Sequence, residues 1–271
     1  MARRPAASAA AENGAPFYER RGFQGTVAVV GLLTAIWGLS GVPSPWSLLG
    51  DLFSTDVARS NTEIVLDSSA AMAESFTKGE TKLEAAVDAL QAAGGRNDEG
   101  LGLRQTNPGC EFEEEPLVDV GTDHVEQVVS AAEQLHPEGK SNIIGAVLAA
   151  LGEFRANPDF NRPGSVRRVL VYTAGQDDCF SGDVSERIRA ELEGADVSAS
   201  FTLIALNASE TDLARLHGLE SALESAGVAS ETIAADDPEQ LDEANEQVSE
   251  ESEEAIEAAE EEQEKEGTVS G

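Results

Sequence analysis

Basic residues are scarce in this chain. Its 271 residues include 18 Lys and Arg against 51 Asp and Glu, which gives a net charge of −33. Binding to nucleic acid needs clustered Lys and Arg against phosphate, so this balance excludes nucleic acid as a partner. A cation, a basic protein surface or a high-salt environment suits such a charge better.

Motifs for catalysis and metal binding are also missing. The chain has no Gly-x-Ser-x-Gly elbow, no phosphate-binding loop and no Gly-x-Gly-x-x-Gly fingerprint. Its histidines, His124, His136 and His217, lack the paired spacing of metal ligands. Its two cysteines, Cys110 and Cys179, have a spacing that fits no zinc site. We therefore expect a protein that is not an enzyme.

Charge is absent between Arg21 and Asp51, and residues 25–42 in that stretch are just long and apolar enough for one membrane crossing. Four Arg precede this segment and two Asp follow it. The asymmetry places residues 1–24, a basic N-terminus, in the cytoplasm and the C-terminal domain outside. We therefore predict a single-pass membrane protein that contacts the membrane through an N-terminal transmembrane helix.

Two other interpretations of residues 25–42 stay open. A cleaved signal sequence has an equally short apolar core, and residues 20–23 (RRGF) resemble a twin-arginine export signal, although Glu19 stands where Ser or Thr is usual. No Ala-x-Ala cleavage site follows; Pro43 and Pro45 come instead. The segment could also be a buried core helix. The anchor and the cleaved signal both place the main domain outside the cytoplasm, as a membrane-bound or a secreted protein.

Short apolar runs alternate with amphipathic stretches through residues 59–248, after a linker at residues 43–58 that contains Pro, Ser and Gly. This alternation predicts an α/β fold, a doubly wound and mainly parallel sheet with helices on both faces. Ligands on such sheets bind at the carboxyl ends of the strands. The expected strands are residues 62–66, 100–105, 116–120, 167–173, 197–206 and 231–234. The expected helices are residues 81–91, 123–135, 143–154, 183–192, 211–226 and 238–248.

Acidic residues dominate the end of the chain. Residues 236–266 hold sixteen acidic residues and one base, and the apolar spacing fades after residue 248. We expect residues 249–271 to be an acidic, solvated tail that is partly helical or disordered.

Three short segments carry a resemblance to a known family. Residues 67–71 (DSSAA) follow the first expected strand, residues 139–143 (GKSNI) open the buried helix, and residues 171–175 (VYTAG) end a central strand. They resemble the Asp-x-Ser-x-Ser turn, the Gly-x-Thr-x-Ile loop and the Thr-Asp-Gly strand end of von Willebrand factor type A domains. Their order and strand context agree with that family over residues 61–248, and the resemblance implies its Rossmann-like fold.

The resemblance also implies a divalent metal site. In the family, two Ser hydroxyls and one Thr hydroxyl contact Mg²⁺ directly and two Asp hold it through water, which suits an ion that prefers six hard oxygen ligands. The positions carried over to this chain are Asp67, Ser69 and Ser141. Ala71 and Ala174 replace the second Ser and the last Asp, so we expect a degenerate site with weak binding of Mg²⁺ or another divalent cation. The simpler interpretation, which we favour over strong metal binding, is that the three residues only cap helices and tie down loops.

Other residues at the same end of the sheet are candidates for contacting a partner. They are Thr173, Gly175, Asp177 and Asp178, and either of the two aspartates could substitute for the carboxylate lost at residue 174. The leading hypothesis is an extracytoplasmic interaction module that binds a protein or a cell-envelope component through these loops. The alternative is an accessory subunit of an envelope complex that acts through its helix faces and acidic tail.

The two cysteines follow the second and the central strand, in loops at this same end. Some secreted bacterial proteins that resemble this chain carry Cys at both places, so the resemblance implies a disulfide between Cys110 and Cys179. Export from the cytoplasm favours such a bridge. Two free thiols are the alternative.

Overall fold

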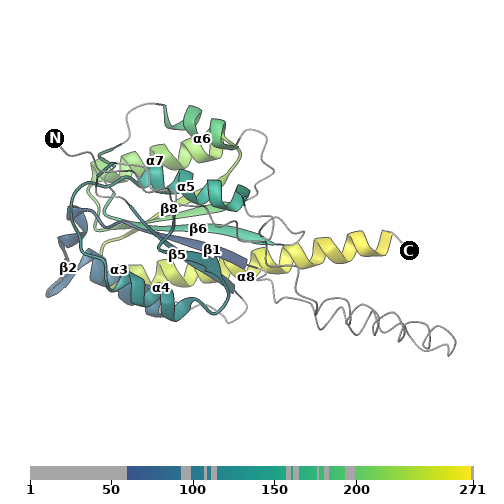
Figure 1. Ribbon diagram of the computed structural model, residues 1–271, viewed down its shortest axis with the longest axis horizontal. Helices are drawn as coiled ribbons and strands as arrows, with labels where there is room; N and C mark the ends of the chain where they lie inside the picture. The colour runs from purple at the N-terminus through teal and green to yellow at the C-terminus, as the bar shows by residue number, and fades with distance from the viewer. Residues whose placement is uncertain are drawn as a thin grey trace, which may run out of the picture. The chain divides into compact units, whose positions relative to one another are not determined.

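A six-stranded sheet forms the centre of the computed structural model (Figure 1). Its strand order is β5-β4-β1-β6-β7-β8. Every neighbouring pair is parallel except β4 and β5, so the predicted α/β fold with a mainly parallel sheet is confirmed. The strands are β1 (Ser60–Leu66), β4 (Glu99–Gln105), β5 (Val118–Gly121), β6 (Val166–Thr173), β7 (Ser200–Leu206) and β8 (Ala229–Ala235).

The structure describes only part of the chain. The predicted N-terminus, transmembrane segment and linker, residues 1–24, 25–42 and 43–58, lie outside the described residues. Within the described part, no helix combines the length and the apolar character that a membrane crossing requires. The described residues are 60–92, 99–106, 109–110, 115–156, 160, 165–175, 177–179, 183–192 and 199–269.

Helices cover both faces of the sheet, as predicted. Helices α3, α4 and α8 pack on one face and α5, α6 and α7 on the other, each against its own hydrophobic cluster (Figure 1). Their bounds are α3 (Lys82–Ala92), α4 (Val125–Ala132), α5 (Ile143–Ala156), α6 (Val184–Leu192), α7 (Glu210–Ser225) and α8 (Pro238–Val269).

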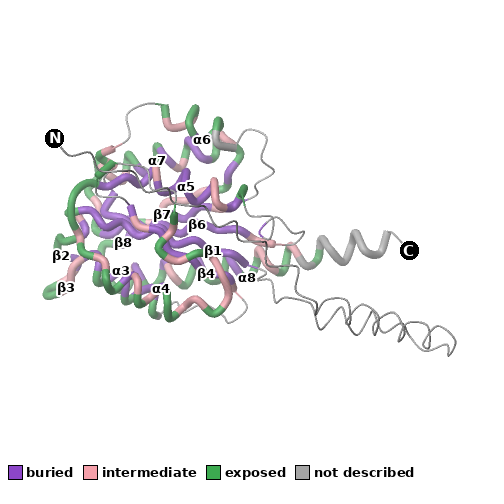
Figure 2. Tube along the Cα trace, in the orientation of Figure 1, coloured by how far each residue is buried: buried purple, intermediate pink, exposed green. Residues whose placement is uncertain are grey.

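Apolar side chains explain which strands and helices lie innermost. Alternate residues of β1 point to opposite faces, so Ile64 and Leu66 join one cluster while Val65 joins the other. Helix α5 is buried along most of its length, as its apolar character on all sides predicts. The buried residues form a continuous layer along the central strands in Figure 2.

A short hairpin was not expected from the sequence. It follows a 3-10 turn at Ala70–Ala73 and consists of β2 (Ser75–Thr77) and β3 (Glu80–Thr81). Strands of three and two residues are too short to produce a recognisable alternation of apolar and polar residues. The hairpin leads directly into α3 at the carboxyl end of β1.

Helix α8 begins at Pro238, the position in the first turn that the sequence analysis assigned to this proline. It runs for 32 residues, so it continues through most of the segment expected to be a partly helical or disordered tail. Leu241, Ala244 and Val248 attach it to the sheet, and Ser252 is also buried. The helix therefore contacts the domain beyond residue 248.

A buried ionic cluster lies between the sheet and α5. Arg104 Nε donates to Glu63 Oε1 at 2.6 Å, and Arg104 Nη2 donates to Glu153 Oε2 at 2.8 Å. The other carboxylate oxygen of Glu63 is buried without a hydrogen-bond partner. Burial raises the pKa of Glu63 to about 7, although the Arg104 charge opposes this rise.

This raised pKa predicts how stability depends on pH. The folded protein holds the Glu63 proton more tightly than the unfolded chain, so the contribution of this group to stability is complete below pH 4.5 and is lost as the pH rises through about 7. Glu63→Gln mimics the protonated form. Urea unfolding should show the stability of the variant relative to wild type increasing over this range, by up to about 3 kcal/mol. Glu243→Gln, which alters an exposed side chain on α8, is the control, and parallel profiles for Glu63→Gln and wild type would contradict the assignment.

Candidate ligand-binding site

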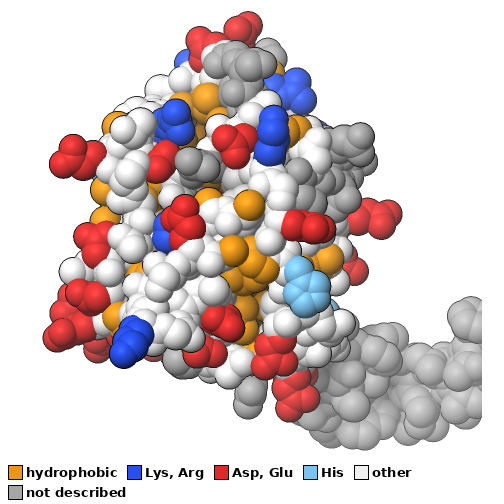
Figure 3. All heavy atoms as spheres, turned by 90° about the vertical axis from the view of Figure 1, so that its left-hand side faces the viewer, with side chains coloured by type: hydrophobic (Ala, Val, Ile, Leu, Met, Phe, Trp, Pro, Cys, Tyr) orange, Lys and Arg blue, Asp and Glu red, His pale blue; other side chains and the backbone are white. Residues whose placement is uncertain are grey.

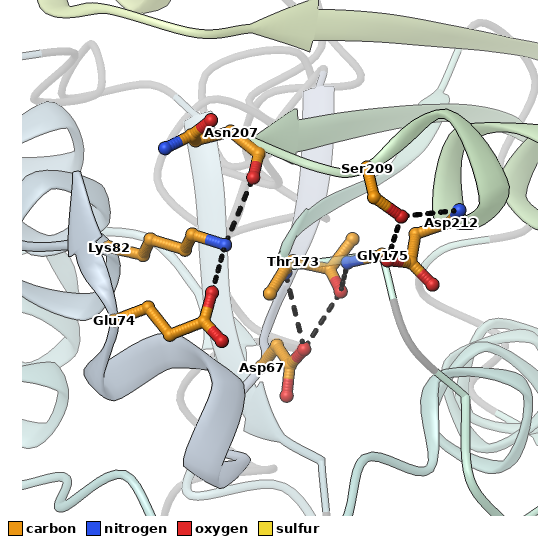
Figure 4. Close-up of polar contacts among 9 residues, drawn as sticks. Asp67, Glu74, Lys82, Thr173, Gly175, Asn207, Ser209 and Asp212 are labelled. Carbon is orange, nitrogen blue, oxygen red and sulfur yellow. Dashed lines mark hydrogen bonds and ion pairs between the residues drawn. The ribbon is translucent and has the colours of Figure 1, made fainter.

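The Asp67 side chain is fully buried at the carboxyl end of β1 and joins three neighbouring strands. Its Oδ2 accepts hydrogen bonds from Thr173 Oγ1 at 2.8 Å and from the Ala174 amide at 3.4 Å, both at the end of β6. Its Oδ1 accepts from the Ser69 amide at 2.9 Å and from Thr106 Oγ1 at 3.1 Å. Both carboxylate oxygens are therefore occupied by protein donors, and Figure 4 shows the contact with Thr173.

Thr106 belongs to the same cluster but is not among the residues predicted from the sequence. It follows β4 directly, and its hydroxyl also accepts from the Ser68 amide at 3.1 Å. The register that pairs Leu66 with Gln105 places Thr106 beside Asp67. A prediction of which strands are neighbours could therefore have identified this residue.

Two buried serine hydroxyls at this end lack a protein partner. Ser69 and Ser141 are 2% and 0% exposed, and neither Oγ has a hydrogen bond within the described part of the structure. These are the hydroxyls that the family resemblance assigns to metal binding. An unmade hydrogen bond of a buried group costs about 1–3 kcal/mol, so the pair calls for an explanation.

The loops that carry the two serines are joined by their backbones. The Ala70 amide donates to the Gly139 carbonyl at 3.2 Å, and the Glu138 amide donates to the Ser68 carbonyl at 2.9 Å. The Asp178 amide donates to the Ser141 carbonyl at 3.0 Å, which adds the loop after β6. The three segments that resemble the family therefore meet in one place.

Gly175 is required by the backbone of the loop after β6. Its φ is +94°, a region that residues with a side chain rarely adopt, and a Cβ atom here would lie 2.8 Å from Asp212 Cβ. Its amide donates to Thr173 Oγ1 at 2.9 Å. Figure 4 shows Gly175 between Thr173 and the start of α7, where Ser209 accepts from the Asp212 amide.

Asp177 lies at the start of α5. Its Oδ2 accepts from the Ile144 amide at 2.8 Å and its Oδ1 from the Cys179 amide at 3.0 Å, so the carboxylate caps the helix. Asp178 is exposed. The Asp177 carboxylate therefore holds the loop after β6 against the start of α5.

A disulfide joins Cys110 to Cys179, with their Cα atoms 5.0 Å apart, so the bridge implied by the resemblance is confirmed. It links the loop after β4 to the loop after β6. Cys179 is hydrogen-bonded to Asp177, which in turn caps α5. The bridge therefore holds the loop that contacts Ser141.

A buried lysine side chain also lies at this end of the sheet. Lys82, 3% exposed, donates from Nζ to Glu74 Oε2 at 2.9 Å and to the Asn207 carbonyl at 3.1 Å (Figure 4). Asn207 follows β7, while Glu74 and Lys82 flank the β2–β3 hairpin. This contact could not be predicted from the sequence, because a lysine at the start of an amphipathic helix is usually exposed.

The residues present fit a tightly bound Mg²⁺ ion poorly. The hydroxyls of Ser69 and Ser141 are available as neutral oxygen ligands, but the Asp67 carboxylate already accepts four hydrogen bonds from the protein. Ala71 and Ala174 contribute no oxygen from their side chains. Among the described residues, no group of three or more His, Cys, Asp or Glu side chains could hold a metal ion. The arrangement suits a neutral hydrogen-bonding ligand better.

Figure 3 turns the side that carries the β2–β3 hairpin toward the viewer. Acidic side chains are spread over this surface, Lys and Arg side chains are few, and hydrophobic side chains are exposed between them. Lys140 and Asp178, from two of the joined loops, are exposed. The joined loops thus carry exposed charges of both signs.

No protein-family model matches the chain, and no curated protein matches it significantly. Solved structures share its fold. A mutant form of the PilB minor pilin from Streptococcus sanguinis aligns with a TM-score of 0.53 at 9% identity, over 73% of this chain and 62% of the pilin. The chain thus spans less than two thirds of the length of that protein.

Two further solved structures are similar. An aerotolerance-related membrane protein from Bacteroides fragilis aligns with a TM-score of 0.51 at 14% identity, over 71% of this chain and 98% of that one. The pilus adhesin SpaC from Lactobacillus rhamnosus GG aligns with a TM-score of 0.50 at 13% identity, over 72% of this chain and 30% of SpaC. At these identities the similarity establishes the α/β fold alone.

The poor fit of these residues to Mg²⁺ can be tested by restoring the oxygen ligands that Ala71 and Ala174 lack. Ala71→Ser combined with Ala174→Asp returns a hydroxyl and a carboxylate to the positions that the family resemblance assigns. Calorimetric titration with Mg²⁺ should show binding at least tenfold tighter than in wild type, a gain of about 1.4 kcal/mol. Adding Asp67→Asn to the double variant should remove that gain. Equally tight binding by the wild-type chain would show that Ala71 and Ala174 do not weaken the site.

The disulfide predicts a measurable loss of stability on its removal. The cysteines are 69 residues apart, and the chain-entropy model gives such a loop about 4 kcal/mol of stabilisation, often less in practice. Replacing both cysteines by serine should lower the unfolding free energy by roughly 2–4 kcal/mol in urea titrations. Labelling of the unfolded, unreduced wild-type chain should detect no free thiol. Full labelling of both cysteines would contradict the bridge.

Proposed function

We propose that this chain is a von Willebrand factor type A-like interaction module that binds a protein or cell-envelope partner through the loops at the carboxyl ends of its strands. The observation that carries the proposal is the pair of buried, unpartnered hydroxyls of Ser69 and Ser141. A ligand group or ordered water that reaches them would complete hydrogen bonds that the protein alone leaves unmade. Binding would then need little or no metal.

The surrounding structure supports this role by fixing the loops before binding. Asp67 ties the first loop to Thr106 and Thr173, and the Cys110–Cys179 bridge restrains the loop beside Ser141. Loops that are already ordered lose less conformational entropy on association. A partner with a basic surface suits the net charge of −33.

We also propose that the domain lies outside the cytoplasm, held by the apolar segment at residues 25–42. The disulfide supports this location, because such bridges persist in oxidising compartments. The four Arg before the segment support the same orientation. The absence of nucleophile and phosphate-binding motifs from the sequence supports binding rather than catalysis.

The location of the contact surface can be mapped by photo-crosslinking in intact cells of the source organism. A photoreactive amino acid at Lys140 or Asp178, both exposed on the joined loops, should give a discrete adduct with an envelope component. The matched positions are Glu186 on α6 and Glu243 on α8, which are exposed on helix faces. Adducts that form from these two positions instead would favour the accessory-subunit alternative.

A role of the Ser69 and Ser141 hydroxyls in partner binding can be distinguished from a role in stability. Ser69→Ala and Ser141→Ala each remove an unpartnered group, so we expect unfolding free energies equal to or above that of wild type. The yield of adduct from the Asp178 position should nevertheless fall several-fold in both variants. Ser68→Ala is the matched control, because its hydroxyl donates to the Thr106 carbonyl at 2.9 Å and its loss should cost about 1 kcal/mol. Unchanged adduct yields in the first two variants would refute the proposal.

A further inference from the structure

A cavity of about 190 Å³ opens at the opposite end of the sheet. It lies where β6, β7 and β8 begin, and α8 forms its remaining wall. Asp67 and Thr173 stand at the other ends of their strands, so the cavity is separate from the loops described above. Two of its lining residues, Glu231 on β8 and Glu251 on α8, are acidic.

One side-chain nitrogen marks a point between these two carboxylates. Gln247 Nε2 donates to Glu231 Oε2 at 3.1 Å and to Glu251 Oε1 at 2.9 Å. A carboxylate from a strand and another from a helix therefore converge on a single position. Oxygens that surround one point in this way are the basic requirement of a site for a hard cation.

Neutral hydroxyl groups also belong to the cavity lining. Thr202 Oγ1 donates to Glu231 Oε1 at 3.3 Å, which fixes the orientation of that carboxylate. Ser252 also lines the cavity, is 3% exposed, and its Oγ has no hydrogen-bond partner among the described residues. A buried, unpartnered hydroxyl in a cavity that two carboxylates also line calls for a ligand that the protein itself does not supply.

We propose that this cavity binds Ca²⁺, with Glu231 and Glu251 as charged ligands and the side-chain oxygens of Gln247 and Ser252 as neutral ones. The Gln247 amide would turn to present its oxygen in place of its nitrogen. Ca²⁺ accepts six to eight oxygens in irregular geometries at about 2.3–2.6 Å, and water fills the open positions. Mg²⁺ demands a regular octahedron, which two flexible carboxylates at a cavity rim do not impose.

The neighbouring charges set the strength of this site. Arg168 lines the cavity and weakens cation binding, but its guanidinium is already bound to Thr62 Oγ1 and to the Val248 carbonyl. Glu220, on α7, acts on Glu231 with an additional negative charge. Two charged ligands with one opposing arginine predict moderate affinity, of the kind found at extracellular Ca²⁺ sites.

Occupation of the site would have a structural effect. Glu231 belongs to the edge strand of the sheet, and the other three ligands lie on one stretch of α8. A bound ion would therefore fasten this helix to the sheet beyond Val248, where its apolar contacts with the core end. This effect does not depend on the proposed partner-binding role of the opposite end.

The test is calorimetric titration of the full chain with CaCl2 at about 0.15 M ionic strength, which screens diffuse attraction to the acidic surface. We expect one saturable site in wild type and binding at least tenfold weaker in Glu231→Gln and in Glu251→Gln. Ser252→Ala should weaken binding without loss of stability. Glu250→Gln is the matched control, because it removes the adjacent exposed carboxylate of the same helix.

Thermal unfolding gives a second readout. Ca²⁺ should raise the unfolding temperature of wild type and of Glu250→Gln, and should leave those of Glu231→Gln and Glu251→Gln unchanged. Mg²⁺ at the same concentration should have a smaller effect. Lack of a saturable site in wild type, or an equal loss of affinity in Glu250→Gln and Glu251→Gln, would overturn the proposal.

Discussion

The hydrogen bonds of the buried Asp67 carboxylate hold the carboxyl end of the sheet together. A carboxylate without water is stable only when donors surround it, and here donors from the ends of β4 and β6 and from the following loop all converge on it. The positions of the loops after three strands therefore follow from one side chain. The backbone contacts of Ser68 and Ala70 with the next loop extend this order to Ser141.

The same network explains how contacts within the protein alone keep this end of the sheet ordered. Thr173 and Thr106 donate hydrogen bonds directly to the carboxylate, so neutral hydroxyl groups of the protein stabilise its buried charge. Lys82 supplies a fixed positive charge elsewhere at this end of the sheet. The buried hydroxyls of Ser69 and Ser141 have no hydrogen-bond partner among the described residues. They can therefore still form hydrogen bonds with a ligand or with water.

Local pattern sufficed for the parts of the fold that have a long period or a long apolar run. Strands β1 and β6 and the buried α5 were predicted within two residues, because each contains an uninterrupted apolar run. The β2–β3 hairpin could not be predicted, since strands of three and two residues are too short to show an alternation of apolar and polar residues. The full length of α8 was not predicted either. Its acidic repeat is equally compatible with a solvated, irregular segment and with a helix.

The site residues that belong to a sequence motif could be predicted. Those that reach the site only through the pairing of strands could not. Asp67, Ser69 and Ser141 stand in segments whose order along the chain indicates a shared location. Thr106 belongs to no motif and is identified only by the register of β1 and β4. Asp177 belongs to a loop that the sequence does predict at this end of the sheet. The partner of its carboxylate, the Ile144 amide, depends on tertiary packing and could not be predicted.

The bond between Cys110 and Cys179 has a consequence for resistance to proteolysis. It closes a covalent ring that contains α4, α5, β5 and β6. A protease that cuts the backbone once inside this ring produces two chains that stay joined through sulfur, and the packed sheet keeps them in register. A single nick would therefore leave the loop-bearing end of the molecule assembled, so that only a second cut or a reductant could release a fragment.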